Sequence, residues 1–345
     1  MKNKAVHTTN YRRLFYLSFL ITAIAFAGCM NRKPKEYTKI SGFTQGTTYG
    51  IVYYDSKNRD FSGSIDTILL RIDTSMSVYN SKSIINAFNS SSSGITVDTL
   101  LAEVVQQSKQ IFIETGGKFD ITVGSLVKAW GFHSKRGEIP SDEEVKRLLA
   151  NIGSDKILLN ELFLSKVNPD VSIDVNAIAQ GFTVDLIAEL FESKGVVDFL
   201  IEVGGEIRAS GKSSRGTGWI VGIDKPVDDA LPGDDLQVKI TLTDFALATS
   251  GNYRKYYVKN GVRYSHTIDS QTGYPVTHSL MSATVVDKTA ARADALATAF
   301  MVMGAEKAQE WLSKNQGVEA YLVYIDLMDN YTVWMTDGMK KFIVE

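Results

Sequence analysis

The sequence predicts an α+β fold, with largely antiparallel sheets packed against helices and two intimately associated subdomains in one compact unit. Three observations lead to this fold class. Strand and helix patterns are mixed along the chain, and hairpin connections are prominent. The strongest hairpin signal is Asn260-Gly261, a predicted type I′ turn between strands at 253–258 and 262–265. No glycine fingerprint of a dinucleotide fold follows a strand, since Gly204-Gly205 alone is a weak signal. A doubly wound sheet is therefore not expected.

The first half of the chain carries one strand and three amphipathic helices. A glycine-bracketed approach leads into a strand at 51–54. Apolar residues at helical spacing predict helices at 63–76 and about 99–114, the second ending at Gly116-Gly117. Ser141 and Glu144 form a capping box just after Pro140, so a helix should start there.

The second half repeats both kinds of element. We predict a helix from about 178 to 193, and strands at 197–203 and 206–209 joined by the two glycines. The alanine-rich run at 290–303 and the segment 305–314 read as two helices broken at Gly304. Strands are expected near 319–325 and 331–335.

Composition places the chain among ordinary globular proteins. Its 345 residues are 44% apolar and 10% aromatic, which suffices for a large core. The formal net charge is only −2, so nothing favours binding to nucleic acid or an electrostatic grip on anionic lipid.

The first residues look like a lipoprotein signal. Four basic residues precede an apolar run from Leu14 to Phe26, and Cys29, the single cysteine, follows small residues. We interpret residues 1–28 as a cleaved signal peptide, Cys29 as the lipidation site, 29–37 as a tether and 38–345 as the folded domain. The alternative is a membrane anchor with an incidental cysteine, for which the run is short.

Two segments carry the residues best suited to chemistry. Asp294 and Thr298 stand four apart in the alanine-rich helix, so a carboxylate and a hydroxyl project from one face. Hard oxygen ligands of this kind suit a magnesium-type ion. His266 follows the predicted hairpin and is available as a proton acceptor or phosphate contact. Taken singly, Asp294 is more often a solvated or dipole-facing carboxylate than a ligand, Asp174 could be only a helix cap, and a histidine placed like His266 is usually a surface or structural residue.

The joint pattern of motifs is more specific than any one of them. In chain order the motifs are Gly117-Lys-Phe-Asp-Ile-Thr-Val-Gly124, Trp130-Gly-Phe132, Asp174-Val-Asn-Ala-Ile-Ala-Gln-Gly181, Val203-Gly-Gly-Glu-Ile-Arg208, Thr249-Ser-Gly-Asn-Tyr-Arg254, His266-Thr-Ile-Asp-Ser-Gln-Thr-Gly-Tyr-Pro275 and Ala293-Asp-Ala-Leu-Ala-Thr-Ala299. Together they resemble the ApbE family of bacterial FAD:protein FMN transferases, from about residue 38 to 340.

The resemblance implies a lipoprotein enzyme that splits FAD with magnesium, passes FMN to a threonine or serine hydroxyl of a partner and releases AMP. It also implies site residues. Asp294 and Thr298 would bind the metal through side chains, and Ala177 through its carbonyl; His266 would support the transfer. The positions implied to line the FAD site are Tyr79, Lys118, Phe119, Asp120, Asp174 and Ile268.

Two positions of the FAD site depart from the family pattern. Gln45 stands where the family commonly has methionine. Gln180 stands where it commonly has lysine, and there the glutamine keeps a hydrogen-bond donor but loses the positive charge. The family implies acceptors in sodium-pumping NADH:quinone reductase and Rnf-type complexes, and a place at the periplasmic side of the inner membrane. The alternatives are a metal-dependent FAD pyrophosphatase, which shares every group named, and a flavin-binding lipoprotein without catalysis.

Overall fold

The structure is a computed structural model that describes residues 35–132, 139–226, 235–252, 256–259 and 262–344. The predicted signal peptide, Cys29 and the Asn260-Gly261 turn lie outside the described residues. Residues 37–345 form one compact unit. Within the ranges described, none of the helices combines the length and hydrophobicity needed to cross a membrane.

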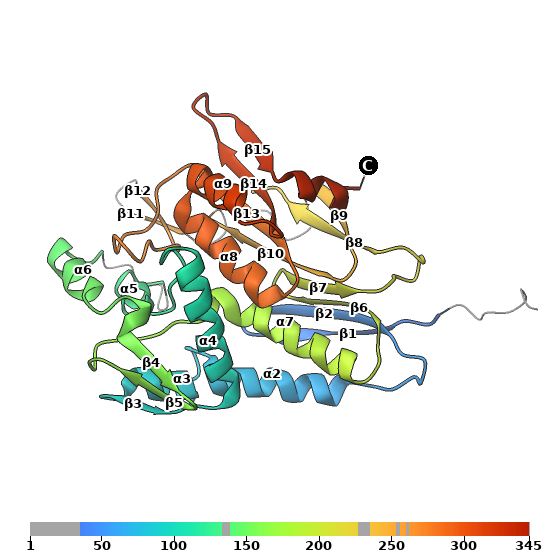
Figure 1. The fold of residues 1–345 in the computed structure, drawn as a ribbon, viewed down its shortest axis with the longest axis horizontal. Coiled ribbons are helices and arrows are strands. Elements are labelled where there is room, and N and C mark those ends of the chain that lie inside the picture. Colours follow the sequence, from blue (N-terminus) through green and yellow to red (C-terminus); the bar gives the residue numbers. More distant parts are fainter. Residues whose placement is uncertain (1–34, 133–138, 227–234, 253–255, 260–261, 345) are drawn as a thin grey trace, which may run out of the picture. The chain divides into compact units, whose positions relative to one another are not determined.

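An eight-stranded sheet runs through this unit, and every neighbouring pair in it is antiparallel (Figure 1). The predicted α+β class with largely antiparallel sheets is therefore confirmed. The strand order is β1-β2-β6-β7-β10-β13-β14-β15. The strands are β1 (Thr38–Thr44), β2 (Thr47–Tyr54), β6 (Asp198–Val203), β7 (Glu206–Ser210), β10 (Phe245–Gly251), β13 (Leu280–Asp287), β14 (Glu319–Ile325) and β15 (Tyr331–Met335).

Both faces of the sheet are covered by other elements. Side chains alternate between the two faces along each strand, so each strand contributes residues to both contacts. On β10, Ala246 and Ala248 point to one face while Leu247 points to the other. The first face packs against α7 (Asn176–Ser193) and α8 (Ala290–Met303). The second face packs against the hairpin of β8 (Trp219–Asp224) and β9 (Leu236–Leu242) and the 3₁₀ helix η2 (Asp337–Phe342).

The remaining elements surround the two covering helices. In Figure 1, α2 (Ser62–Met76) lies below α7, and α4 (Thr99–Glu114) lies to the left of α7 and α8. The helix α9 (Ala305–Lys314) follows α8 in the chain. A small sheet has the order β3-β5-β4, and β11 pairs with β12 as a separate hairpin. These shorter elements are β3 (Gly94–Thr96), β4 (Ile157–Asn160), β5 (Phe163–Lys166), β11 (Tyr256–Lys259), β12 (Val262–Ser265), α3 (Ile84–Ser90), α5 (Gly124–Ala129), α6 (Asp142–Leu149) and η1 (Ser154–Lys156).

Most elements expected from the sequence are confirmed. α8 and α9 have the bounds predicted, and Gly304 between them has a φ of 81°. Ser141 caps α6 by accepting a hydrogen bond from the Glu144 amide. α7 starts two residues earlier than expected, because the Asp174 carboxylate accepts a hydrogen bond from the Asn176 amide at 2.8 Å and supports an earlier turn.

Candidate functional site

α7 and α8 make the closest helix contact near the predicted metal residues. A methyl group placed on Gly181 of α7 would come within 2.3 Å of the Ala290 carbonyl oxygen on α8. The neighbours on α8 are also small, so the two backbones approach each other directly. The absence of a side chain at Gly181 therefore sets the spacing between the two helices.

A buried carboxylate of α7 holds the start of α8. Asp185 accepts hydrogen bonds from the amides of Ala290 (3.0 Å) and Ala291 (2.9 Å), and from Arg208 (2.8 Å). These amides are among those that a helix leaves without a partner in its first turn. Burial raises the pKa of Asp185, and the two amides and the guanidinium act in the opposite direction.

A second buried carboxylate, on α8, accepts a hydrogen bond from a backbone amide of α7. Asp294 is 5% exposed, and its Oδ2 lies 3.3 Å from the Gly181 amide. The alternative of a solvated carboxylate is therefore wrong. Ala177 precedes Gly181 by one turn, so its carbonyl points along α7 toward the same amide. Thr298 follows Asp294 by one turn on α8. The structure thus places Asp294 against the turn of α7 that contains Ala177 and Gly181, with Thr298 one turn further along α8.

The end of β10 connects Thr298 to the segment of His266. Thr298 shares a hydrogen bond with the Ser250 hydroxyl at 3.1 Å. Two residues on, the side-chain oxygen of Asn252 accepts hydrogen bonds from the hydroxyls of Ser265 and Thr267. These two residues flank His266, so the histidine lies on a segment fixed next to the strand that contacts Thr298.

A second contact fixes the other side of the His266 segment. Lys118 forms an ion pair with Asp269 at 3.1 Å, and both side chains are mostly buried. Ser270 donates a hydrogen bond to the Gly117 carbonyl at 2.7 Å, and Gln271 donates one to Gly116 at 2.9 Å. The diglycine turn after α4 is therefore docked onto the segment that carries His266 and Ile268.

Four of the predicted FAD-site residues, Phe119, Asp120, Asp174 and Ile268, are at least partly packed into the protein. Phe119 is 2% exposed within the main core, and Ile268 is 7% exposed against Trp130. A contact of Phe119 with a nucleotide would therefore involve its backbone. Burial raises the pKa of Asp120, while hydrogen bonds from the Thr122 amide (2.8 Å) and hydroxyl (2.6 Å) oppose the rise.

Asp174 and Tyr79 are close enough to influence each other. Partial burial raises the pKa of the Tyr79 hydroxyl, and the negative charge of Asp174 raises it further. The Tyr79 side chain is otherwise 71% exposed, which suits a surface for stacking. The Asp174 amide donates a hydrogen bond to Ile121 at 2.7 Å, which ties it to the Asp120 segment. The capping role considered for Asp174 is also present, through its bond to Asn176.

The two departures from the family pattern lie at one junction. Gln45, in the turn between β1 and β2, donates a hydrogen bond to the Thr183 hydroxyl of α7 at 2.8 Å. Gln180, three residues before Thr183, lies against Gly204 in the turn between β6 and β7, since a methyl group there would meet its amide nitrogen at 2.6 Å. Both glutamines therefore join sheet turns to α7.

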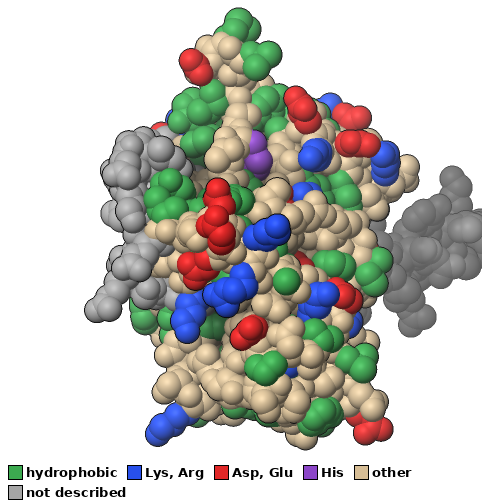
Figure 2. All heavy atoms as spheres, turned by 90° about the vertical axis from the view of Figure 1, so that its left-hand side faces the viewer, with side chains coloured by type: hydrophobic (Ala, Val, Ile, Leu, Met, Phe, Trp, Pro, Cys, Tyr) green, Lys and Arg blue, Asp and Glu red, His purple; other side chains and the backbone are tan. Residues whose placement is uncertain are grey.

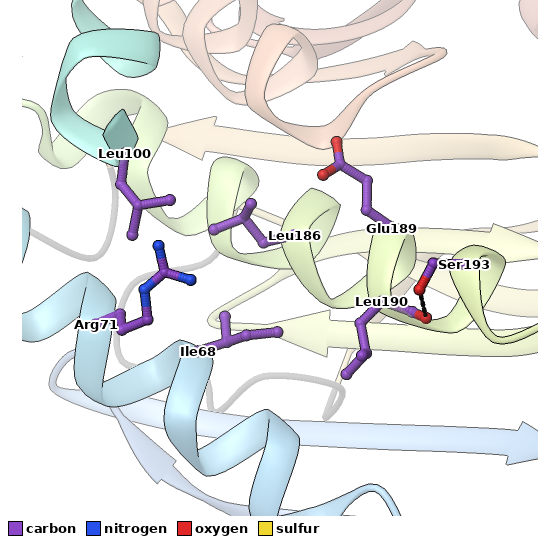
Figure 3. A pocket seen from close by; sticks show the side chains of 7 residues that line it. All are labelled: Ile68, Arg71, Leu100, Leu186, Glu189, Leu190 and Ser193. Carbon is purple, nitrogen blue, oxygen red and sulfur yellow. Dashed lines mark hydrogen bonds between the residues drawn. The ribbon is translucent and has the colours of Figure 1, made fainter. Parts of the chain in front are cut away.

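A hollow of roughly 270 Å³ lies elsewhere, between α2, α4 and α7 (Figure 3). Figure 3 shows the Arg71 guanidinium reaching toward Leu100, beside Leu186. None of its lining residues is a predicted site residue. Figure 2 shows the side of the molecule on which α5 and α6 lie, where acidic and basic side chains gather around the middle and a histidine is visible above them.

The donor set around Asp294 fits a hard divalent cation. It consists of a carboxylate, a hydroxyl and a carbonyl, all oxygen ligands of the kind that Mg²⁺ takes while keeping positions for phosphate and water. Among the described residues, no three His, Cys, Asp or Glu side chains come close enough to bind a metal together. A site with a single carboxylate is consistent with this result.

Comparison with known proteins decides the family. The model of the ApbE family matches residues 45–322. This chain belongs to the ApbE family. A curated relative from Vibrio cholerae, named FAD:protein FMN transferase, is 35% identical and is covered over 98% of its length, with 95% of this chain. A relative of the same name from Escherichia coli is 34% identical, with 95% of this chain and 97% of its own length covered.

Solved structures of ApbE proteins have the same fold. The flavin transferase ApbE from Vibrio cholerae gives a TM-score of 0.80 at 35% identity, covering 90% of this chain and all of that one. The flavinyl transferase ApbE from Pseudomonas stutzeri, in its apo form, also gives 0.80, at 30% identity, over 91% of this chain and 98% of that one.

Several residues that support the site were not anticipated from the sequence. They are Asp185, Arg208, Asn252, and Arg292, which bonds to Glu114 at the end of α4 and to Asp287. Asp185 had one usable signal, an acidic residue on the apolar face of a long helix. The other contacts join segments far apart in sequence, which periodicity does not reveal.

Proposed function

We propose that this protein is an FAD:protein FMN transferase, which splits FAD and attaches FMN to a threonine or serine hydroxyl of another protein. The observation that supports this proposal most directly is the contact of the buried Asp294 carboxylate with the Gly181 amide where α7 and α8 touch, one turn from both Ala177 and Thr298. Membership of the ApbE family supplies the reaction class. Tyr79 and Asp174 lie on the segments that would receive the nucleotide.

The transfer breaks a phosphoanhydride bond of FAD and forms a phosphoester bond to the acceptor. The acceptor hydroxyl oxygen forms a bond to the phosphorus of the FMN half of FAD, and the bond from that phosphorus to the bridging oxygen breaks. AMP leaves with the bridging oxygen. The hydroxyl proton must pass to a base, and we assign this role to His266.

Residues of this chain position the reactants. The segment of His266 is held by Asn252 on one side and by the Lys118–Asp269 pair on the other, so its place relative to α8 is fixed. Tyr79 offers an exposed aromatic ring to the flavin or the adenine. Fixing donor and acceptor together removes much of the entropic barrier to the reaction.

Asp294, Thr298 and the Ala177 carbonyl are the residues that would bind magnesium. The ion, when bound, supplies Lewis-acid neutralisation of the pyrophosphate oxygens. Burial of Asp294 strengthens its attraction for a cation, since charges interact more strongly away from water.

The acceptor and the location follow from the family and from the N-terminal residues. We propose that acceptors are flavin-carrying subunits of sodium-pumping NADH:quinone reductase or Rnf-type complexes. The basic and apolar residues before Cys29 support a lipid-anchored protein at the periplasmic side of the inner membrane.

The decisive experiment is mass spectrometry of an acceptor domain incubated with residues 31–345, FAD and Mg²⁺. We expect one FMN to be esterified to a threonine or serine, with AMP released in equal amount. If only free FMN and AMP appear with every acceptor tested, water is the attacking group and the protein is a pyrophosphatase.

The role of His266 is tested in the same assay. His266→Ala should abolish FMN transfer while FAD still binds, because the acceptor hydroxyl would lose its base. His278→Gln is the matched control, since His278 lies at the far end of α8, bonded to Met301. Transfer at the wild-type rate by His266→Ala would place the base elsewhere, with Asp269 the next candidate.

A further inference from the structure

The short helix α3 presents two asparagines toward two different loops. Asn86 and Asn89 are three residues apart, so their side chains lie next to each other on the helix surface. Both are half-buried. Each amide group is bonded to backbone groups of a loop outside the helix, and the two loops carry Tyr79 and Asp174.

Asn86 holds the loop that carries Tyr79. Its amide nitrogen donates to the carbonyl oxygens of Val78 at 3.0 Å and Asn80 at 2.9 Å, the residues on either side of Tyr79. A longer contact of 3.4 Å reaches Ser77. A single amide thus holds the backbone that projects the Tyr79 ring.

Asn89 holds the segment that ends in Asp174. Its amide nitrogen donates to the Ile173 carbonyl at 2.9 Å, and its oxygen accepts from the Ile173 amide at 2.8 Å. Both backbone groups of the residue preceding Asp174 are therefore bonded to one side chain, 84 residues away in sequence. On the opposite side, the Asp174 amide donates to Ile121.

A buried lysine joins α3 to the same segment. Lys166 is 7% exposed, and its ammonium group donates to the carbonyls of Asn89, Pro169 and Val171, each at 3.0 Å. Burial lowers the pKa of this amine. The three bonds fasten the residues before Asp174 to the last turn of α3.

We propose that Asn86 and Asn89 are positioning residues, which fix Tyr79 and Asp174 relative to each other so that both contact FAD. This inference rests on the proposed function, because it takes these two side chains as parts of the FAD site. Tyr79 and Asp174 belong to separate loops that reach the site from different parts of the chain. α3 is the rigid element that both loops share, and loops that bind ligands depend on such scaffolds.

The test measures FAD affinity by flavin fluorescence with Mg²⁺ present and no acceptor protein, and the signal is read before FAD is consumed. Asn86→Ala and Asn89→Ala should each raise the Kd by roughly tenfold, comparable to the ~10–100-fold loss of affinity when a residue that orients a metal ligand is replaced. In the transfer assay the KM for FAD should rise while kcat stays within about twofold, because the ligands on α7 and α8 are untouched. Amide exchange at Ile173 and Asp174 should speed up in Asn89→Ala.

Asn315→Ala is the matched control. It removes one side-chain bond to a backbone carbonyl, 2.7 Å long, at the end of α9. It should lower thermal stability to a similar extent and leave the Kd for FAD unchanged. Asn89→Asp serves if the alanine variant does not fold. It keeps the acceptor for the Ile173 amide, loses the donor, and should give an intermediate Kd.

Tyr79→Ala and Asp174→Ala separate the two proposals. If neither variant changes the Kd, FAD does not bind at these residues and the assignment of the site fails first. If both raise the Kd while Asn86→Ala and Asn89→Ala bind as the wild type does, the positioning role alone is overturned. The double variant should weaken binding by less than the product of the single effects, because either loop moving already changes the spacing. If the increase in Kd of the double variant equals the product of the two single increases, the two asparagines act independently, and the proposal that α3 fixes both loops relative to each other is contradicted.

Discussion

Replacing Gly181 by alanine tests whether the contact between α7 and α8 creates the metal site. The new methyl group would lie 2.3 Å from the Ala290 oxygen, 2.5 Å from the Ala290 carbonyl carbon and 2.7 Å from the Ala291 nitrogen. All three are backbone atoms, so no side chain can rotate away. Since such contacts do not occur below 3.0 Å, the helices must separate by at least about 0.7 Å.

The separation affects stability less than it affects the site. Overpacking costs about 1–3 kcal/mol, and the higher helix propensity of alanine offsets up to ~1 kcal/mol. We therefore expect a net loss of roughly 0–3 kcal/mol and a folded protein. Mg²⁺ requires oxygen ligands near 2.0–2.1 Å with a tolerance of about 0.2 Å. Moving Asp294 and Thr298 by 0.7 Å relative to Ala177 exceeds that tolerance several times.

The assay is FAD turnover as a function of Mg²⁺ concentration, with thermal unfolding measured on the same samples. Gly181→Ala should need much more Mg²⁺ and lose about 100-fold in turnover. Gly63→Ala is the control, because Gly63 lies in α2 with open space where its methyl would be. It should be at least as stable as the wild type and equally active. If Gly181→Ala has the wild-type Mg²⁺ requirement, the helix contact does not set the ligand geometry and the reasoning is wrong.

Three further predictions concern Asp294, His278 and Cys29. Asp294→Asn keeps the shape but removes the charge. The Mg²⁺ requirement should therefore rise by at least the ~10–100-fold that is typical when a residue hydrogen-bonded to a metal ligand is replaced. An unchanged requirement in a Mg²⁺ titration would exclude Asp294 as a ligand. Burial lowers the pKa of His278, whose Nδ1 accepts from the Leu280 amide, although its bond to Met301 opposes the shift. The unfolded chain then binds more protons, so stability should fall as pH drops below about 6.5, and His278→Gln should lose this component. Parallel unfolding curves from pH 7.5 to pH 5 for both proteins would contradict this. Cys29→Ser should abolish incorporation of labelled palmitate and leave an uncleaved precursor; full labelling would contradict lipidation there.

The elements that the sequence identifies well are those whose environment is simple. α8 is an alanine-rich run that ends at a glycine with positive φ, so propensity and termination agree. β10 and β13 lie in the middle of the sheet and are buried on both faces. Their apolar runs lack the alternation that distinguishes a strand from a short helical segment, and no strand was predicted there.

In the candidate site, too, the sequence reveals the residues that share one helix but not the contacts between distant segments. The spacing of Asp294 and Thr298 is visible in the sequence because both lie on one helix. The partner of Asp294, the Gly181 amide, is 113 residues away, and Ile173 is 84 residues from Asn89. α3 itself lies in a segment rich in serine and asparagine, residues that favour caps and turns over helix interiors. The bonds from Asn86 and Asn89 to the two loops join segments distant in sequence, which no local pattern encodes.

The arrangement of the two buried carboxylates indicates how phosphate charge is neutralised here. The N-terminus of a helix often binds phosphate through its exposed amides. At α8 the amides of Ala290 and Ala291 are taken by Asp185, and at α7 the Asn176 amide is taken by Asp174. Neither helix start therefore offers these amides to a pyrophosphate. If the proposed site is correct, the charge of the substrate would be balanced by a cation bound at Asp294 and by Lys118, whose ammonium is shared with Asp269. A site built in this way would depend on its metal more than one that binds phosphate on helix amides.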